Sequence, residues 1–202
     1  MVLVLATQNQ DKVQEIKAIL GESVVDMTLK TLADFPGLKL PPETGQTYRE
    51  NALQKAIHVA KATGEMAMGD DSGLEVDALD GAPGLYSARF AGENATYADN
   101  RGKILQLLEG LPDEKRGARF VCTIAIARSQ GSVDVVEGAC DGRITATASG
   151  EGGFGYDPIF FYPPEAKTFS ELTFEEKNRI SHRACALRAA VHLINAVRAQ
   201  KH

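Results

Sequence analysis

Two adjacent carboxylates followed by a serine and a glycine are the strongest candidates for chemistry in this chain. The segment Asp70-Asp71-Ser72-Gly73 follows the residues Met66 to Met68, and we expect it to lie just beyond the end of a short strand. Carboxylates in that position can bind Mg²⁺ or activate a water molecule, and Ser72 can donate a hydrogen bond to a phosphate. Adjacent acids in a loop also commonly face solvent, so this segment alone leaves both interpretations open.

The sequence around these acids carries a further excess of negative charge. Between Glu43 and Asp80 there are eight acidic residues (43, 50, 65, 70, 71, 75, 77 and 80) against three basic ones (49, 55 and 61). Glu43 and Glu50 could each bring another carboxylate to the site. Hard divalent cations prefer oxygen ligands, so this composition favours such a cation as a partner.

A polar turn near the N-terminus could bind an anion. The apolar run Val2–Ala6 predicts a buried strand, and apolar residues at helical spacing from Val13 to Leu20 predict a helix. The turn between them consists of Thr7, Gln8, Asn9, Gln10, Asp11 and Lys12. Backbone N–H groups at a helix start, together with these side-chain donors and the lysine, suit a phosphate. An ordinary helix N-cap with a solvated lysine is the alternative.

Two later segments combine aromatic and basic side chains. Phe154-Gly155-Tyr156-Asp157 places two rings on a glycine-rich loop, and a nucleobase stacks on such a ring for about 1–3 kcal/mol. Core packing beside a glycine hinge is the alternative. Near the start of a final helix, which Ser181 can cap, lie Lys177, Arg179, His182 and Arg183. Cations there oppose the helix dipole, which hints at function, although most charge runs are solvated faces.

One nucleotide-binding motif is excluded by its context. Gly150 to Gly155 matches the dinucleotide fingerprint G-x-G-x-x-G, but that motif works only where it opens a helix. Tyr156-Asp157-Pro158 and a β-type run follow instead, so we do not expect a Rossmann site. The chain also lacks the phosphate-binding pattern G-x-x-x-x-G-K-[ST].

Composition excludes several classes of protein. The 202 residues include 44% hydrophobic and 24% charged residues, typical of a globular protein rather than a coiled coil or a disordered tail. The net charge of −5 argues against a nucleic-acid polymer as partner. The charge is uneven, because residues 167–202 contain seven basic and three acidic residues, whereas residues 1–166 contain 15 and 24. Three cysteines without a CxxC pair, and no apolar run near membrane-spanning length, favour a soluble cytoplasmic protein with no membrane partner.

Hydrophobic periodicity and turn residues predict a single α/β domain over residues 1–202, with a mixed sheet and helices on its faces. Expected strands are 2–6, 24–29, 66–68, 74–79 and 159–162, with a hairpin formed by 119–128 and 132–140. Expected helices are one ended by Gly21, one over 48–62, one over 97–109, and a final one that turns Leu187, Val191, Ile194 and Val197 inward. Capping-box spacings at Thr168 and Thr173 predict helix starts there.

Taken in order, seven motifs resemble those of the inosine-triphosphate pyrophosphatase family, in its bacterial branch that acts on noncanonical purine nucleoside triphosphates. They are Ala6–Lys12, Glu43–Gly45, Glu50–Ala56, Asp70–Leu74, Gly81–Arg89, Gly152–Pro158 and Ile180–Arg183. The resemblance implies hydrolysis of ITP, dITP and XTP to the nucleoside monophosphate and pyrophosphate, which cleanses the nucleotide pool. It also implies Mg²⁺ as cofactor, a cytoplasmic homodimer, and an elongated mixed β-sheet whose two lobes flank a central nucleotide-binding cleft.

The resemblance also implies roles for individual residues. Asp71 becomes the catalytic base, and Asp71, Glu43 and Asp70 become metal ligands. The implied substrate-binding residues are Thr7, Gln8, Asn9, Gln10, Asp11, Lys12, Lys55, Ser72, Phe154, Gly155, Tyr156, Asp157, Lys177, His182 and Arg183. A metal-binding acid of the family falls on Pro42 here, so Glu43 is expected to serve instead, or the metal to depend on Asp70 and Asp71.

The rejection of adenine requires a hydrogen-bond donor directed at the purine O6 atom. Either Arg183 or a nearby backbone N–H group could supply this donor, and adenine's amino group would then meet a donor. Two rival functions remain. A Maf-type nucleotide pyrophosphatase would share the chemistry with another base preference, and the Ser-His-Arg segment argues against it. A non-catalytic nucleotide-binding module would not need the carboxylate set.

Overall fold

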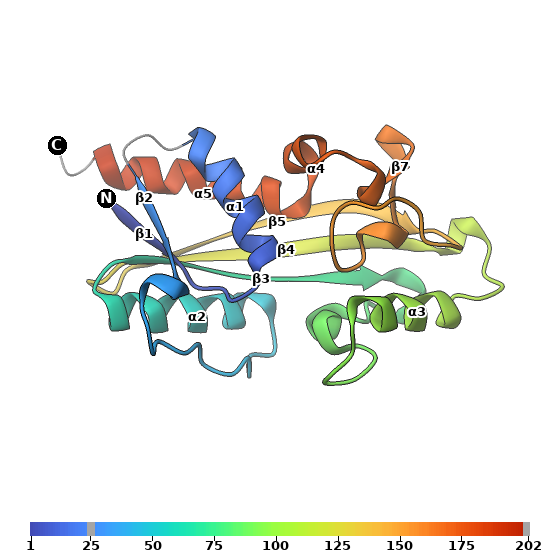
Figure 1. The fold of residues 1–202 in the computed structure, drawn as a ribbon, viewed down its shortest axis with the longest axis horizontal. Helices are drawn as coiled ribbons and strands as arrows, with labels where there is room; N and C mark the ends of the chain where they lie inside the picture. Colours follow the sequence, from blue (N-terminus) through green and yellow to red (C-terminus); the bar gives the residue numbers. More distant parts are fainter. Residues whose placement is uncertain (24–26, 200–202) are drawn as a thin grey trace. The chain divides into compact units, whose positions relative to one another are not determined.

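The computed structural model describes residues 1–23 and 27–199, and within them seven strands form one sheet in the order β2-β1-β3-β4-β5-β6-β7 (Figure 1). The sheet is mixed, as predicted: β1 pairs in parallel with β2 and β3, whereas β6 pairs antiparallel with β5 and β7. The strands are β1 (Val2–Leu5), β2 (Thr28–Thr31), β3 (Met66–Val76), β4 (Gly117–Ala127), β5 (Val133–Ile144), β6 (Phe160–Tyr162) and β7 (Lys167–Thr168). The helices are α1 (Gln10–Ser23), α2 (Tyr48–Thr63), α3 (Tyr97–Leu107), α4 (Phe174–Ile180) and α5 (His182–Ala199).

The chain forms two compact units. Unit 1 comprises Met1–Asp71, Cys122–Gly138 and Arg183–His202, and unit 2 comprises Ser72–Val121 and Ala139–His182. The chain passes from one unit to the other within β3, β4 and β5 and at the start of α5. Each unit has a hydrophobic core of its own.

Strand β1 is buried on both faces from Leu3 to Leu5, which explains its continuous apolar run. Successive strand residues point to opposite faces. Leu3 and Leu5 pack in the cluster that contains residues of α1 and α5, whereas Val4 packs with Ala52 and Ala56 of α2. Accordingly, α1 and α5 cover one face of β1 and α2 covers the other (Figure 1).

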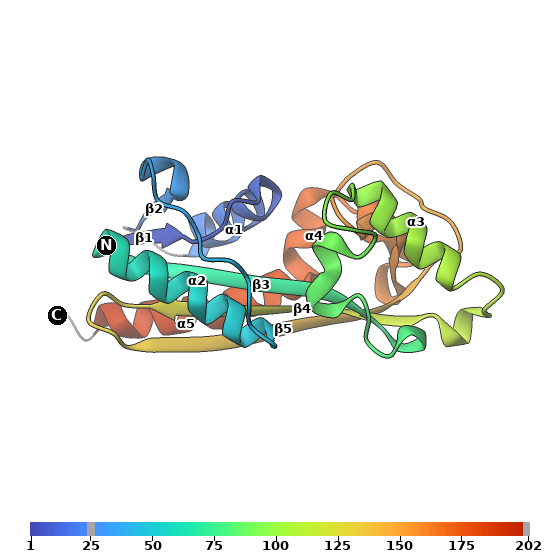
Figure 2. The same cartoon turned by 90° about the horizontal axis from the view of Figure 1, so that it is seen from below.

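The core of unit 2 is aromatic. The Phe120 ring lies 4.6 Å from that of Phe160 and 5.8 Å from that of Phe169. Ile104 and Leu108, from α3 and the residue that ends it, are buried in the same cluster. Figure 2 shows α3 from another side, next to the loop that precedes β6.

Local sequence signals placed several elements correctly. Helix α2 begins after Thr47, whose side chain accepts from the Glu50 N–H, and ends at Gly64 with φ of 72°. The hairpin is confirmed as the neighbouring strands β4 and β5. Both predicted capping boxes form, at Thr168 and at Thr173. The glycine run from Gly150 opens no α-helix and leads into the 3₁₀ turn Asp157–Ile159 and β6, so the exclusion of a Rossmann site is confirmed.

Other boundaries were wrong. Helix α1 continues through Gly21 to Ser23, and the second strand lies at Thr28–Thr31 rather than 24–29, of which 24–26 lie outside the described residues. In the final helix Leu187 and Ile194 are buried and Val191 is partly buried, while the Val197 side chain is outside the described part.

The most consequential error concerns Gly69 to Gly73. This segment is not a loop at a strand end, because β3 runs through it without interruption. Gly69 allows the close approach of α2, since a Cβ there would lie 2.4 Å from the Ala52 carbonyl oxygen. Asp70 and Asp71 are tolerated within a buried strand because each has charged or polar partners.

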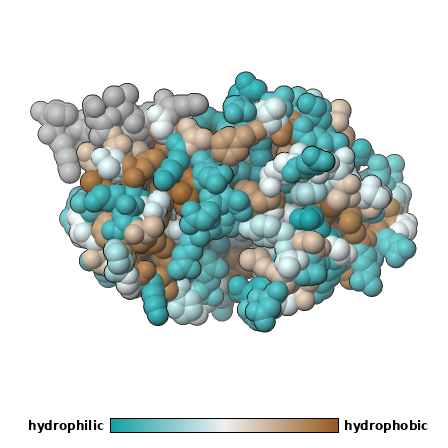
Figure 3. All heavy atoms as spheres, viewed as in Figure 1, coloured by the Kyte–Doolittle hydropathy of each residue, from teal (hydrophilic) through white to brown (hydrophobic). Residues whose placement is uncertain are grey.

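The surface in Figure 3 is mostly hydrophilic, with hydrophobic side chains dispersed among polar ones. No helix among residues 1–23 and 27–199 has the length and apolar character needed to cross a membrane.

Candidate functional site

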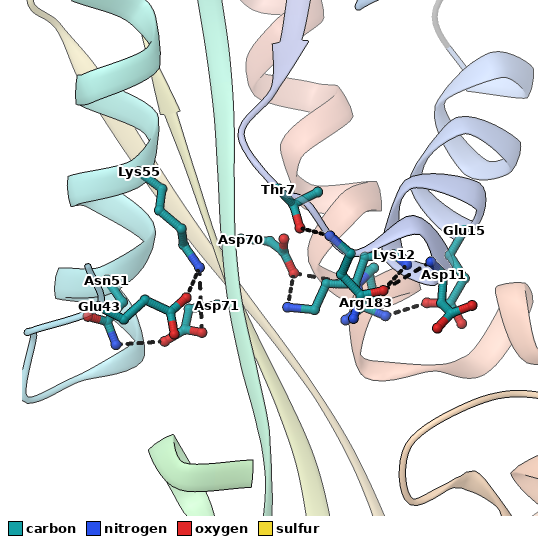
Figure 4. A network of polar contacts seen from close by, with 11 residues as sticks. Thr7, Asp11, Lys12, Glu15, Glu43, Asn51, Lys55, Asp70, Asp71 and Arg183 are labelled. Atoms are coloured by element: carbon teal, nitrogen blue, oxygen red, sulfur yellow. Dashed lines mark hydrogen bonds and ion pairs between the residues drawn. The ribbon is translucent and has the colours of Figure 1, made fainter. Parts of the chain in front are cut away.

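Strand β3 directs Asp70 and Asp71 into two separate polar networks in unit 1 (Figure 4). Because neighbouring residues of a strand point to opposite faces, their carboxylates diverge. Asp70 faces Lys12 and Arg183, whereas Asp71 faces Asn51 and Lys55. The sequence suggested two carboxylates side by side at a strand end, and the structure instead gives each its own set of partners.

The Asp70 network is a buried chain of alternating charges. The Lys12 ammonium lies 2.8 Å from the Asp70 Oδ2 atom, and Arg183 Nε lies 3.7 Å from the same oxygen. The Arg183 guanidinium also pairs with Glu15 on α1. Burial alone would raise the pKa of Asp70, but the charges of Lys12, Arg183 and Lys55 outweigh it and hold that pKa well below its usual range. Asp70 is therefore ionised near neutral pH and pairs with Lys12, with the Arg183 guanidinium close to the same oxygen.

Arg183 is more enclosed than its predicted role requires. Only 1% of its side chain is exposed, and burial, which would lower its pKa, is outweighed by Glu15 and Asp70, which raise it. A guanidinium carries five N–H donors, and the contact with Glu15 uses Nη1. The structure places Arg183 beside Glu15 and Asp70 in unit 1, and its contact with the purine O6 atom stays a prediction.

The Thr7–Lys12 turn is a helix N-cap. Asn9 Oδ1 accepts hydrogen bonds from the backbone N–H groups of Asp11, at 3.0 Å, and Lys12, at 3.2 Å. The Asn9 N–H in turn donates to Thr7 Oγ1 at 3.2 Å. Gln8 and Gln10 are exposed at the same turn. The helix cap is thus confirmed, but the expectation of a solvated lysine is wrong, because the Lys12 side chain is only 15% exposed and its ammonium lies 2.8 Å from Asp70 on β3.

The Asp71 network lies between β3 and α2. Asn51 Nδ2 donates to Asp71 Oδ2 at 3.0 Å, and Asn51 Oδ1 accepts from the Gly45 N–H at 2.8 Å, which ties the loop before α2 to this site. The Lys55 ammonium lies 2.7 Å from Glu43 Oε1 and 3.7 Å from Asp71 Oδ1. Glu43, Lys55 and Asp71 therefore share one face of β3.

Asp70 and Asp71 differ in their proton affinity. Burial raises the pKa of Asp71, and the opposing effects of Lys55, Lys12 and the Asn51 hydrogen bond do not cancel it. Burial would lower the pKa of Lys55, but Asp70, Asp71 and Glu43 together raise it. The pKa values of the two carboxylates are shifted in opposite directions, so the two groups suit different tasks. The carboxylate with the raised pKa, Asp71, suits a general base.

The oxygen atoms of Glu43 and Asp71 are the candidate ligands for a divalent cation on this face of β3. No group of three or more His, Cys, Asp or Glu side chains in the described part of the chain could hold a metal by itself. Mg²⁺ commonly uses only one or two protein carboxylates and takes its other ligands from water and substrate phosphates. Glu43 and Asp71 provide such a pair, and Asp70 is turned away from it.

A second cluster of predicted residues lies in unit 2. The Lys177 ammonium is 2.5 Å from Asp157 Oδ2, which also accepts from the Phe154 N–H at 2.8 Å. The same ammonium lies 4.6 Å from the centre of the half-buried Phe154 ring. Gly153, with φ of 69°, permits this turn, since a Cβ there would lie 2.2 Å from Asp157 Oδ2. The cluster holds Phe154 in a defined position beside a buried ion pair.

Two further predicted residues are core elements of unit 2. The Tyr156 ring is buried, its hydroxyl donates to the Ser87 carbonyl at 2.7 Å, and burial raises its pKa. The buried His182 ring stacks on Phe120 with centres 4.6 Å apart. Ser72 is half-buried in β3, in unit 2. Of the two loop aromatics, Phe154 is thus the one that remains partly exposed.

Sequence reasoning missed Glu15 and Asn51 as site residues. Glu15 is 2% exposed and pairs with Arg183, and Asn51 is 4% exposed and bonds Asp71. Helical spacing could have identified Glu15, which lies three residues after Lys12 and four before the buried Ile19. The signal for Asn51 is weaker, because it lies one residue from the exposed Glu50 on α2.

Known proteins resemble this chain along nearly its whole length. A model described as the Ham1 family matches residues 3–193. A dITP/XTP pyrophosphatase of Desulforamulus reducens is 50% identical over 198 residues, covering 96% of each chain. One from Thermus thermophilus is 50% identical over 189 residues, covering 94% of this chain and 89% of that protein.

Solved structures agree. A HAM1 protein from Coxiella burnetii superimposes with a TM-score of 0.87 at 39% identity, covering 97% of this chain and 99% of that one. A nucleoside-triphosphatase, or dITP/XTP pyrophosphatase, from Mycobacterium abscessus superimposes with a TM-score of 0.75 at 42% sequence identity. The match covers 94% of this chain and 97% of that one. With a family model over almost the full length and relatives that share half of its residues, the chain belongs to the Ham1 family.

Proposed function

We propose that this chain is a nucleoside-triphosphate pyrophosphatase that hydrolyses dITP, XTP and ITP to the nucleoside monophosphate and pyrophosphate. The observation that carries the proposal is Asp71, a mostly buried carboxylate of raised pKa held by Asn51 and accompanied by the Lys55 ammonium. The names of the relatives, dITP/XTP pyrophosphatase, support the substrate class. The enzyme is accordingly a hydrolase.

Asp71 is the proposed general base. A water molecule forms a bond to phosphorus, its proton passes to an Asp71 oxygen, and the bond to the departing pyrophosphate breaks. A base of raised pKa retains that proton better than an ordinary aspartate. The Asn51 hydrogen bond to Oδ2, at 3.0 Å, fixes the carboxylate and leaves Oδ1 toward Lys55.

Lys12 and Lys55 are the proposed phosphate-binding cations of unit 1. Phosphoryl transfer depends mainly on positioning and on neutralisation of charge, so fixed cations supply much of the catalysis. Asp70 and the Asn9 cap hold Lys12, and Glu43 holds Lys55. Thr7 and Ser72 are proposed to add hydroxyl donors. Gln8, Asn9, Gln10 and Asp11 are assigned to the same turn.

Mg²⁺ is the proposed cofactor, with Glu43 and Asp71 as its protein ligands. When bound, it would neutralise phosphate charge and polarise the phosphoryl oxygens. Asp70, which the sequence also suggested as a ligand, is assigned instead to the positioning of Lys12, because its carboxylate faces Lys12 and Arg183.

The Phe154 loop of unit 2 is the proposed site for the purine. Phe154 offers a partly exposed ring, and Asp157 and Lys177 hold it in place through the Phe154 N–H and the ring face. Gly155 and Tyr156 continue this loop, and His182, which stacks on Phe120, is assigned to the same nucleoside-binding set. A donor on this loop that meets a 6-oxo group would reject adenine, since an unpaired buried polar group costs about 1–3 kcal/mol.

The decisive experiment is a panel of nucleoside triphosphates assayed with Mg²⁺ for pyrophosphate and for orthophosphate. We expect pyrophosphate as the primary product from dITP, XTP and ITP, with much lower rates for dATP and dGTP. Orthophosphate as the primary product would refute cleavage between the α and β phosphates. Preference for another base would favour a Maf-type specificity, and binding without turnover would favour a non-catalytic module.

The family resemblance further supports a homodimer and a cytoplasmic location. Cys122, Cys140 and Cys185 form no disulfide, which suits a reducing compartment. Light scattering of the purified protein tests the dimer, and fractionation of the source cells tests the location.

A further inference from the structure

Helix α3 contacts the proposed purine loop at two points one turn apart. The Tyr97 ring centre lies 6.2 Å from that of Phe154, with the ring planes inclined by 45°. Arg101 Nη1 donates to the Gly155 carbonyl oxygen at 2.8 Å. Residues four apart lie on the same side of a helix, so one side of α3 faces the loop at both Phe154 and Gly155. All four residues belong to unit 2.

Core packing does not explain the Tyr97 contact. Tyr97 is 42% exposed, one of five large hydrophobic side chains exposed in the described part of the chain, and Phe154 is only half-buried. A Cβ built on Gly155 would have no atom within 4 Å, so the space beside this backbone is open. Two partly exposed rings therefore lie close to open space beside Gly155, where a flat ligand could approach.

Arg101 fixes the orientation of one peptide in this loop. In a trans peptide the C=O and the following N–H point in opposite directions. With the Gly155 carbonyl held by Arg101, the Tyr156 N–H points away from that guanidinium. The Tyr156 hydroxyl bond to Ser87 and the Phe154 N–H bond to Asp157 restrain the residues on either side. The peptide N–H is thereby a fixed donor.

We propose that Tyr97 and Arg101 complete the purine site, Tyr97 as a second aromatic contact for the base and Arg101 as the positioning residue of the Gly155–Tyr156 peptide. This inference rests on the proposed function, which assigns the purine to the Phe154 loop. The ligand class is a 6-oxopurine nucleotide. The fixed Tyr156 N–H supplies a donor for its O6 atom.

The chain contains no tryptophan, so Tyr97→Trp creates a single fluorescent reporter at this position. We expect saturable quenching of its emission by ITP in EDTA, where no turnover occurs. Leu107→Trp is the matched control, because Leu107 lies at the far end of α3 and is 50% exposed in the native protein. Its fluorescence should not change with ITP. Equal responses of the two reporters, or none from Tyr97→Trp at ITP concentrations that saturate the native enzyme, would overturn the Tyr97 assignment.

Kinetics test the two residues separately. Tyr97→Ala should raise KM for dITP roughly 2- to 10-fold with kcat unchanged, the range expected for one aromatic contact. Arg101→Met should raise KM for dITP and lower the ratio of kcat/KM for dITP to kcat/KM for dATP. Arg101→Lys should restore part of that ratio, because the lysine can donate to the same Gly155 carbonyl. An unchanged ratio in a folded Arg101→Met protein would overturn the peptide assignment. Loss of all triphosphate hydrolysis in the native protein would instead refute the proposed function.

Discussion

Asp70 and Asp71 are consecutive in the chain, yet their carboxylates lie on opposite faces of β3 and bind different cations. Lys12 is 2.8 Å from Asp70, whereas Lys55 is 3.7 Å from Asp71. The pKa of Asp70 is lowered and that of Asp71 is raised. This relationship distinguishes the anion that pairs with Lys12 from the proposed catalytic base, and it leads to distinct expectations for the two residues.

Asp71→Asn should abolish most pyrophosphate release while nucleotide binding persists. The amide keeps the shape of the side chain but cannot accept the proton from water, and loss of a general base costs about 10²- to 10⁴-fold in rate. Pyrophosphate release from dITP measures the rate, and equilibrium binding of dITP in EDTA measures affinity. Turnover at the native rate would contradict the role given to Asp71.

Asp70→Asn should act mainly on stability. Removing this charge leaves Lys12 and the buried Arg183 undercompensated, and breaking a buried pair costs about 3–5 kcal/mol in the free energy of unfolding. Asp113→Asn is a control, because Asp113 is 61% exposed in its pair with Arg143 and such surface pairs contribute about 0–1 kcal/mol. Urea unfolding compares the variants, and equal losses would disprove the distinction.

The same residue predicts the pH dependence of folding. The folded pKa of Asp70 lies below its usual value of 3.8, so its contribution to stability is fully present above that pH and is lost as the pH falls toward the folded pKa. The native protein should therefore lose stability below about pH 4 more steeply than Asp70→Asn. Parallel acid-unfolding curves would show that Asp70 is not responsible.

Asp71 predicts a titration in the metal-free protein. Its folded pKa is raised above 3.8, so ionised Asp71 disfavours folding slightly, and its base form is lost already as the pH falls through that raised value. We expect the Asp71 carboxyl resonance, followed by NMR in EDTA, to titrate with a midpoint above pH 3.8, and Asn51→Ala, which removes a hydrogen bond that lowers the pKa, to move it higher. A midpoint that stays in place in Asn51→Ala would contradict the assignment.

Lys55→Met should strengthen the binding of a divalent cation in the absence of nucleotide. The Lys55 ammonium now neutralises the two proposed metal ligands, Glu43 at 2.7 Å and Asp71 at 3.7 Å. Methionine keeps the apolar stem and removes the competing charge. Titration with Mn²⁺ followed by electron paramagnetic resonance measures the affinity, with Lys61→Met on the exposed face of α2 as control. Weaker Mn²⁺ binding by Lys55→Met would exclude this competition.

Much of the fold followed from local sequence. The apolar run of β1, the capping residues Thr47 and Gly64 of α2, and the Ser129–Gly131 turn between β4 and β5 act over a few residues, so their effects can be deduced without a structure. β3 was divided in error because Gly69 and two acids are unfavourable in strands. Its continuity depends on the packing of α2 against Gly69 and on charged partners supplied by distant segments.

The sequence by itself determined the inventory of reactive groups, the main secondary structure and the family motifs. Tertiary structure decided which charges meet. Glu15 and Arg183 are 168 positions apart, yet they form a buried pair, and only that pairing shows Arg183 to be enclosed. Pairing and burial set the proton affinity of a carboxylate, because Coulomb energies and desolvation depend on distances in space rather than along the chain. The different partners and opposite pKa shifts of Asp70 and Asp71 are therefore a property of the fold.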